Sequence, residues 1–245
     1  MDMSAEQYIY LIKEKIKYEN RFFIDEEFNK ILDILCNDKQ LITNIKEDTI
    51  LYRARIYNKS DKYKKYRSDY KKDEKFFGFN AEESFVLKDK SKVKDGRCNP
   101  SFIPYLYTSK DIETAIKETR PYVYSVVSVS EIRVKENLKL LDLSKTYSID
   151  YDKWILQFKL DINLEISLPY HEGGDYQLSQ YISEYIKNKG FDGIMYRSAY
   201  VSISKKVLEE KGVNITVFNY NKCESVSSEL YRVDEIETTY ESLKG

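Results

Sequence analysis

The stretch from Gly96 to Pro121, GRCNPSFIPYLYTSKDIETAIKETRP, brings Arg97, Tyr107 and Glu118 close together in the chain. An arginine fork binds phosphate oxygens in pairs, and a tyrosine ring stacks on flat heterocycles. A buried carboxylate stabilises the positive charge that develops at a sugar carbon as a glycosidic bond breaks. The three side chains together suit a nucleotide sugar with a good leaving group. NAD⁺ fits this description because its nicotinamide is already cationic, so that no strong general acid is needed.

A plainer interpretation of the same stretch exists. The helix expected before Pro121 would bury Ile112, Ala115 and Ile116, and Glu118 and Arg120 would then lie on its solvent face. Spacing alone favours this plainer interpretation.

Other catalytic residue types are scarce. The chain has one histidine, His171, three widely separated cysteines and eight glycines, without a GxGxxG or P-loop motif. These counts argue against a multi-histidine metal centre, a zinc site or a dinucleotide fingerprint. We therefore expect no metal and no resident cofactor, with NAD⁺ as the substrate.

The charge balance limits the partners. The 40 Lys and Arg residues nearly cancel the 41 Asp and Glu residues, so no net field attracts nucleic acid or an acidic membrane. The start of the chain is not a signal peptide, no apolar run could span a bilayer, and the odd cysteines fit a reducing compartment. We expect a cytoplasmic protein without membrane contact and without direct nucleic-acid binding.

The hydrophobic pattern predicts the elements that would position these residues. Residues 1–47 are expected to be helical, with a capping box from Ser4 to Gln7. Alternation predicts a strand over 49–57, which places Arg53 and Arg55 on one face that looks onto solvent or an anion. Residues 58–95 form a charged insertion. Lysines and tyrosines alternate there as in single-strand binders, but the interspersed acidic residues favour a solvated segment.

The second half of the chain continues the mixed pattern. A strand at 105–107 precedes Ser109, which is placed to cap the helix that follows. Strands are expected at 122–130, 138–144, 194–196 and 214–220, and an amphipathic helix over 178–186 that closes at Gly190. Strict alternation from Leu160 to Leu168 favours a further strand within 154–169, although Trp154, Ile155 and Phe158 would also suit a helix. The tail after 222 is expected to be polar and peripheral.

Short strands interrupted by helices at irregular spacing indicate an α+β domain rather than a doubly wound sheet. The predicted organisation is an N-terminal helical extension (1–47), a catalytic domain (48–222) containing the 58–95 insertion, and a C-terminal tail (223–245).

The chain resembles the RES-domain family over roughly 51–220. The resemblance rests on LYRAR near Arg53, GRCNP ahead of IPYLY, TAIKE at the helix and FDGIMYRS near Ser198, in that order and at that approximate spacing. It implies an ADP-ribosyltransferase-like split antiparallel β core with surrounding helices. It also implies degradation of NAD⁺ by phosphorolysis or hydrolysis. Many members are toxins that a helix-turn-helix antitoxin neutralises, and a homo-oligomer is a further expectation.

The resemblance also implies roles for individual residues. Glu118 would stabilise the oxocarbenium-like centre, and Arg53 would bind phosphate or the nicotinamide ribose. Substrate binding is expected from Arg97, Tyr107, Ser198 and Tyr52, and support from Gln180, Asp192 and Asn99.

Three features depart from the family pattern. Cys98 stands where tryptophan or alanine is usual, the 58–95 insertion separates the two arginines, and the N-terminal helices exceed the minimal domain. The alternative activity is ADP-ribose transfer to a protein or nucleic acid. Arginine-directed transferases pair two glutamates two residues apart, and Ile116 occupies the earlier position here.

Overall fold

The computed structural model describes residues 3–57, 78–87, 89–145, 152–168, 176–201 and 211–237, and the protein has an α+β fold. The α-helices are α1 (Ala5–Tyr18), α2 (Glu26–Asn37), α4 (Ala81–Ser84), α5 (Ile112–Glu118), α6 (Lys153–Ser167) and α7 (Gln177–Asn188). Two short 3₁₀ helices are η2 (Lys90–Lys92) and η3 (Tyr220–Lys222). The strands are β1 (Ile42–Ile45), β2 (Ile50–Ile56), β3 (Leu106–Ser109), β4 (Val126–Val134), β5 (Leu138–Asp142), β6 (Gly193–Arg197), β7 (Val213–Val217) and β8 (Cys223–Arg232).

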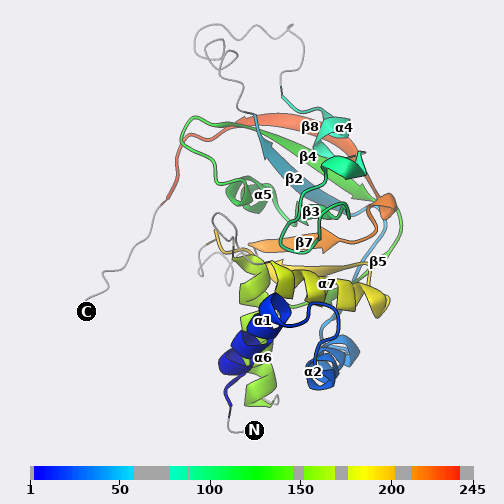
Figure 1. The fold of residues 1–245 in the computed structure, drawn as a ribbon. Coiled ribbons are helices and arrows are strands. Elements are labelled where there is room, and N and C mark those ends of the chain that lie inside the picture. The colour runs from blue at the N-terminus through cyan, green and yellow to red at the C-terminus, as the bar shows by residue number, and fades with distance from the viewer. Residues whose placement is uncertain are drawn as a thin grey trace, which may run out of the picture.

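The strands form one mixed sheet in the order β1-β5-β6-β7-β3-β2-β4-β8 (Figure 1). β5 and β6 run parallel, and the other neighbouring pairs are antiparallel. β2 follows β4 over its whole length, but it meets β3 through a single pair, Tyr52 with Ser109. The sheet therefore opens between β2 and β3, and backbone and side chains at this opening are free to line a cavity.

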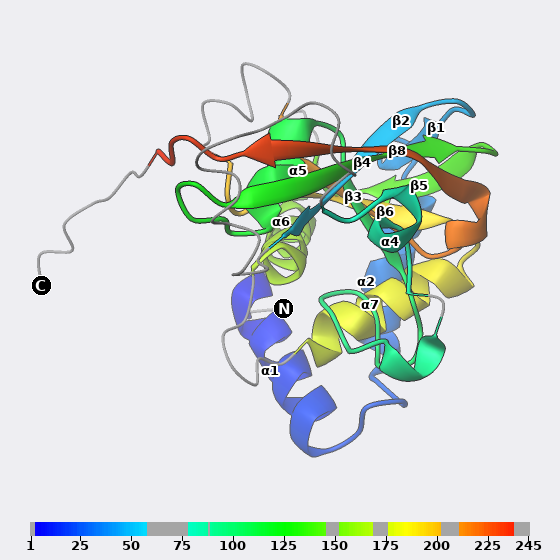
Figure 2. The same cartoon turned by 90° about the horizontal axis from the view of Figure 1, so that it is seen from above.

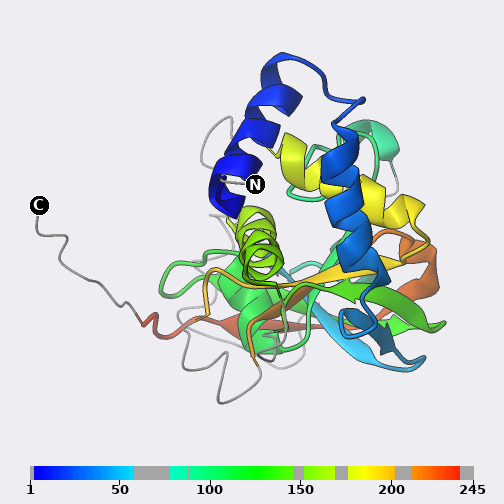
Figure 3. The ribbon, with the colours of Figure 1, turned by 90° about the horizontal axis from the view of Figure 1, so that it is seen from below.

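Two apolar clusters hold the sheet from opposite faces. The larger cluster packs α1, α2, α6 and α7 against Leu141, Ile194 and Tyr196 of the sheet, and these four helices gather on one side (Figure 3). The smaller cluster contains Leu51, Ile132 and other strand residues on the other face. The central strands β6 and β7 are covered on both faces, so nearly all of their residues are buried, the polar Asn214 and Thr216 included.

The N-terminal extension packs on the main body of the protein. Ser4 and Gln7 form the expected capping box at the start of α1, and Tyr8, Ile12 and Ile16 are buried at helical spacing. The expectation that all of 1–47 is helical is wrong, because β1 pairs with β5 from Ile42 to Ile45. Within the described ranges, every helix is too short or too polar to traverse a bilayer.

The strand favoured within 154–169 is also wrong, because α6 spans this stretch. Asp152 caps the helix by accepting from the backbone N–H groups of Trp154 and Ile155. Phe158, Ile162 and Ile166 are buried at a spacing of four, whereas Leu160 and Leu164 are exposed. Residues two apart lie on nearly opposite sides of a helix, so the alternating leucines and isoleucines divide between solvent and core.

The tail after 222 is not peripheral throughout, since β8 runs beside β4 as the last strand of the sheet (Figure 2). The sequence CESVSSELYR lacks the hydrophobic pattern of a buried strand. β8 has a neighbouring strand on one side only and stays partly exposed to water, so it does not need that pattern. β4 also begins later than expected, at Val126, because Tyr124 has a positive φ of 67° and the chain turns there.

Candidate active site

A cavity of about 320 Å³ lies at the opening between β2 and β3. A volume of this order accommodates part of a nucleotide-sized ligand. Its lining comprises Tyr52, Arg53 and Ala54 of β2, Asp95–Arg97, Tyr107–Ser109 of β3, Ala115, Glu118, Thr119, Tyr176, Tyr196 and Asn214. Of the nine residues expected at the site, the structure brings Tyr52, Arg53, Arg97, Tyr107 and Glu118 to this one cavity.

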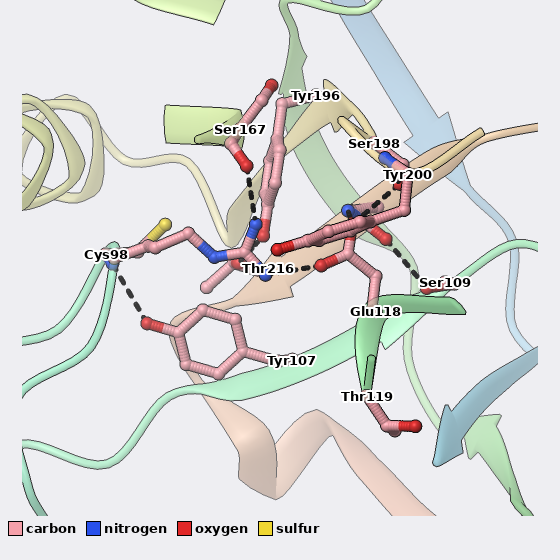
Figure 4. Close-up of polar contacts among 12 residues, drawn as sticks. Cys98, Tyr107, Ser109, Glu118, Thr119, Ser167, Tyr196, Ser198, Tyr200 and Thr216 are labelled. Atoms are coloured by element: carbon pink, nitrogen blue, oxygen red, sulfur yellow. Dashed lines mark hydrogen bonds and ion pairs between the residues drawn. The ribbon is translucent and has the colours of Figure 1, made fainter. Parts of the chain in front are cut away.

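Glu118 is the last residue of α5, a helix that Asp111 caps by accepting from the backbone N–H of Thr114. Its side chain is only 12% exposed, so the interpretation that placed it on the solvent face is wrong. Oε1 accepts from Ser198 Oγ at 2.7 Å and from Asn214 Nδ2 at 2.5 Å, and Oε2 accepts from Arg97 Nη2 at 2.6 Å. In Figure 4, Glu118 extends from the end of α5 toward Ser198 and Tyr200. These three hydrogen bonds, one of them from a charged guanidinium, fix the position of the carboxylate.

Arg97 spans the cavity from the loop ahead of β3. Nη1 donates to the backbone carbonyl of Ser167 at 2.9 Å, Nη2 donates to Glu118, and the guanidinium carbon lies 5.8 Å from the centroid of the Tyr196 ring. Burial disfavours the cation, but the neighbouring Tyr196 and Glu118 outweigh burial and hold the pKa of Arg97 above its ordinary value. The guanidinium is therefore a fixed positive charge beside the carboxylate.

The loop from Gly96 to Asn99 is fixed by the Tyr107 hydroxyl. Tyr107 Oη donates to Asn99 Oδ1 at 2.7 Å and accepts from the backbone N–H of Cys98 at 2.9 Å. Gln180 Nε2 donates to the carbonyls of Gly96 and Asn99. A Cβ at position 96 would lie 2.6 Å from Asn99 Oδ1 and 2.8 Å from Tyr107 Oη. Position 96 must therefore be glycine for this loop to close around the hydroxyl.

Arg53 carries a second positive charge at the cavity. Nη1 donates to the carbonyl of Tyr107 at 3.0 Å, and Nε is buried without a hydrogen-bond partner in the described part of the chain. Burial, and secondarily the nearby Arg55, lowers the pKa of Arg53 to about 10, so it stays protonated at neutral pH. Among the described residues, no carboxylate pairs with it. A buried cation in this condition is costly unless an anion binds there.

Arg55 lies on the same face of β2 as Arg53 but contacts other residues. Its Nη1 donates to the carbonyl of Glu83, and its guanidinium carbon lies 4.3 Å from the centroid of the Phe79 ring. It does not line the cavity.

Sequence reasoning missed Asn214 and misassigned Ser109. Asn214, on β7, is buried and donates to Glu118, while its Oδ1 accepts from Ser109 Oγ at 2.7 Å. Ser109 ends β3 and does not cap α5, because Asp111 does. The available signal was an asparagine between valine and isoleucine in the strand VNITV, since a buried amide needs partners for its polar atoms.

Four of the expected residues lie outside the cavity lining: Gln180 and Asn99, which hold the loop described above, and Ser198 and Asp192. Ser198 is fully buried behind Glu118, and its Oγ also accepts from the backbone N–H of Tyr200 at 3.1 Å. Asp192 lies at the opposite end of β6, where it accepts from the backbone N–H of Lys139 and pairs with Lys222 at 3.0 Å. It joins strands rather than supporting the cavity directly.

Some sequence features cannot be placed. His171 and residues 58–77 of the charged insertion lie outside the described residues.

Cys98 is buried, and burial is the main reason that the pKa of its thiol is raised, as for a packing residue rather than a nucleophile. Among the described residues, no group of three or more His, Cys, Asp and Glu side chains could hold a metal ion.

The profile of the RES domain matches residues 72–235, and the chain belongs to this family. The matched range includes Arg97, Glu118 and Ser198 as well as β8, and it begins after Arg53. No curated protein matches the chain. A solved structure with a similar chain is the crystal structure of the M. tuberculosis MbcT–MbcA toxin–antitoxin complex. The similarity has 12% identity, a TM-score of 0.43, and coverage of 85% of this chain and 92% of that one.

Proposed function

We propose that the protein degrades NAD⁺ by cleaving the bond between nicotinamide and ribose, as an NAD⁺ phosphorylase or glycohydrolase. The observation that carries this proposal is the Glu118 carboxylate, held by three donors at the wall of a cavity that also contains the Arg53 cation, for which the described residues supply no carboxylate partner. The negative charge of Glu118 suits a developing cation, and the positive charge of Arg53 suits a phosphate. A substrate with both features is a pyridine dinucleotide.

The chemistry follows from these charges. When the glycosidic bond breaks, nicotinamide leaves with the bonding electron pair and becomes neutral, while positive charge develops at C1 of the ribose. A fixed carboxylate stabilises that charge without reorganising, which is where electrostatic preorganisation lowers a barrier most. The leaving group needs no proton, so the site needs no general acid. Glu118 is the proposed stabilising residue, and Ser198 and Asn214 keep its Oε1 in position.

Binding is assigned to the remaining cavity residues. Arg53 would hold a phosphate of the dinucleotide, since its Nε has no partner among the described residues. Tyr52 and Tyr107 line the same cavity and offer aromatic surface to nicotinamide or ribose. Arg97 is already engaged by Glu118 and Ser167, so any contact with the substrate phosphates would be made by the same guanidinium that holds the carboxylate.

Water and phosphate are the two candidate acceptors, and either ends with a new C1–O bond. Water loses one proton and gives ADP-ribose, whereas phosphate gives ADP-ribose 1″-phosphate. Transfer to a protein or nucleic acid is the alternative activity. The residue two before Glu118 is Ile116, so the glutamate pair of arginine-directed transferases is missing.

The test is incubation of the purified protein with NAD⁺ in phosphate-containing and in phosphate-free buffer, with nicotinamide and sugar products resolved by chromatography and mass spectrometry. Phosphate-dependent formation of the 1″-phosphate identifies a phosphorylase, and ADP-ribose in both buffers identifies a glycohydrolase. Label transferred from NAD⁺ to macromolecules would favour the alternative. Unchanged NAD⁺ under all conditions would refute the proposal.

We further propose that the protein acts inside the cytoplasm as a toxin that a helix-turn-helix antitoxin restrains, on the basis of RES family membership and the resemblance described above. Expression in a bacterial host should then stop growth as cellular NAD⁺ falls, and the Glu118→Gln variant should not. A homo-oligomer and the absence of direct nucleic-acid binding stay predictions, to be checked by light scattering and by gel-shift assays.

A further inference from the structure

A chain of oriented hydrogen bonds reaches Glu118 from the strand side of the cavity. Ser109 Oγ, at the end of β3, donates to Asn214 Oδ1 at 2.7 Å, and Asn214 Nδ2 donates to Glu118 Oε1 at 2.5 Å. Both residues are buried, at 3% exposure each. The serine hydroxyl can donate one proton, and the amide oxygen can only accept. The carboxylate oxygen of Glu118 accepts, so it selects the NH₂ end of the Asn214 amide. The serine hydroxyl then satisfies the amide oxygen at the other end.

We propose that Asn214 is a positioning residue for Glu118 and that Ser109 holds the Asn214 amide in place, so that the carboxylate stays aimed into the cavity. This inference rests on the NAD⁺-cleaving function proposed above and adds residues to it. β7 supplies Asn214 and β3 supplies Ser109, and the two positions are directly paired in the sheet. Glu118 ends a seven-residue helix, and its carboxylate is thus held in place by the rigid sheet as well as by that helix.

The amide orientation matters because the reverse orientation is repulsive. A flipped Asn214 would place its carbonyl oxygen against Glu118 Oε1, and two acceptors would then face each other in a site largely removed from water. The carboxylate would have to rotate, protonate or exchange its partner. Ser198 donates to the same oxygen at 2.7 Å, so loss of Asn214 weakens the anchoring of Oε1 without removing it.

The test compares Asn214→Ala, Ser109→Ala and the double variant with the wild type. We expect kcat to fall on the order of tenfold to a hundredfold for Asn214→Ala, with KM for NAD⁺ within about threefold, as for one lost donor acting through another group. Ser109→Ala should lower kcat by a smaller factor, again with little change in KM.

The double variant separates this inference from a simple loss of packing. If Ser109 acts only through Asn214, Ser109→Ala has no further effect in the Asn214→Ala background. Losses that multiply, or an unchanged kcat in both single variants, would overturn the proposal. Ser227→Ala is the matched control, since it removes a serine-to-carboxylate hydrogen bond, to Glu131 at 2.9 Å, on strand β8. It should leave kcat and KM unchanged.

A structural measurement keeps the inference independent of the NAD⁺ activity. Crystal structures of the wild type and Ser109→Ala should differ in the side-chain conformation of Asn214 or of Glu118. If the wild type does not cleave NAD⁺ but this difference is seen, the proposed function fails while the positioning role stands. If NAD⁺ is cleaved but both side chains keep one orientation in Ser109→Ala, the positioning role is refuted.

Discussion

Arg97 and Glu118, 21 positions apart in the sequence, form an ion pair with 2.6 Å between Nη2 and Oε2. Their side chains are 18% and 12% exposed, so both charges have left most of their water. Partial burial makes each residue depend on the other, because an isolated charge in this place would be costly. The pair also ties the loop ahead of β3 to the end of α5, the two segments that carry the proposed chemistry.

The Glu118→Gln variant tests the proposed role of the carboxylate. The amide keeps the shape but loses the negative charge that stabilises positive charge at the ribose, so the rate of NAD⁺ cleavage should fall on the order of 10²–10³-fold. Glu113→Gln is the matched control on the same helix, since Glu113 pairs with Lys117 and Lys211 away from the cavity. It should retain wild-type activity. A fully active Glu118→Gln variant would assign the charge stabilisation elsewhere.

The two cavity arginines should respond oppositely to replacement by methionine. Arg97→Met leaves Glu118 without its charged partner and should lower the free energy of unfolding by about 3 kcal/mol. Arg53→Met removes a buried cation without a described carboxylate partner, so the free energy of unfolding should equal or exceed that of the wild type. Denaturant unfolding measures both effects.

The same arginine replacement should separate stability from binding. Arg53→Met should raise KM for NAD⁺ on the order of tenfold or more, because a charge-assisted phosphate contact is lost. Arg53→Lys keeps the positive charge but loses the forked pair of N–H donors. Its KM for NAD⁺ should therefore lie between the values of the wild type and Arg53→Met. An Arg53→Met variant that is destabilised by several kcal/mol and still binds NAD⁺ normally would contradict the assignment of an anion site.

Gly96→Ala tests the packing of the loop around Tyr107. The new Cβ would lie 2.6 Å from Asn99 Oδ1 and 2.8 Å from Tyr107 Oη, closer than such contacts occur. We expect the free energy of unfolding to fall by about 1–3 kcal/mol, with a parallel loss of activity. Adding Tyr107→Phe removes one of the two clashing atoms and should recover part of the stability. Equal stability of Gly96→Ala and the wild type would show that the loop can move aside.

The buried Lys159 predicts how the free energy of unfolding depends on pH. Its side chain is fully buried on α6, its Nζ donates to the carbonyl of Lys145, and burial lowers its pKa to about 8 although Asp142 opposes the shift and Arg197 adds to it. The unfolded chain then binds more protons than the fold between about pH 8 and 10.5. The free energy of unfolding should therefore gain up to about 2–3 kcal/mol from this residue as pH rises through that window.

Comparison with Lys159→Met isolates this contribution from the titration of the many tyrosines. The difference in unfolding free energy between wild type and variant, measured by urea denaturation at intervals from pH 7 to 10.5, should change in favour of the wild type as pH rises. A difference that is constant with pH would show that Lys159 titrates normally in the folded protein.

The sequence by itself determined the α+β class, the strand at Arg53, the capping box of α1 and the helix that ends near Gly190, because each depends on periodicity or on a local cap. It also supplied the residue types for the chemistry, since few others were present. The sequence predicted a strand in place of α6, because apolar residues at every second position are compatible with a strand and also with a helix that has apolar residues on two sides. It missed β8 because pairing with β4, not hydrophobicity, makes that strand.

Only the tertiary structure decided where Glu118 points. Its spacing on α5 suited solvent, yet the helix ends at the sheet, where Asn214, Ser198 and Arg97 converge on the carboxylate from segments 96, 80 and 21 positions away. Hydrogen bonds between residues so distant in sequence leave no local pattern. The chain order specified the groups, and the opening of the sheet between β2 and β3 made them one site.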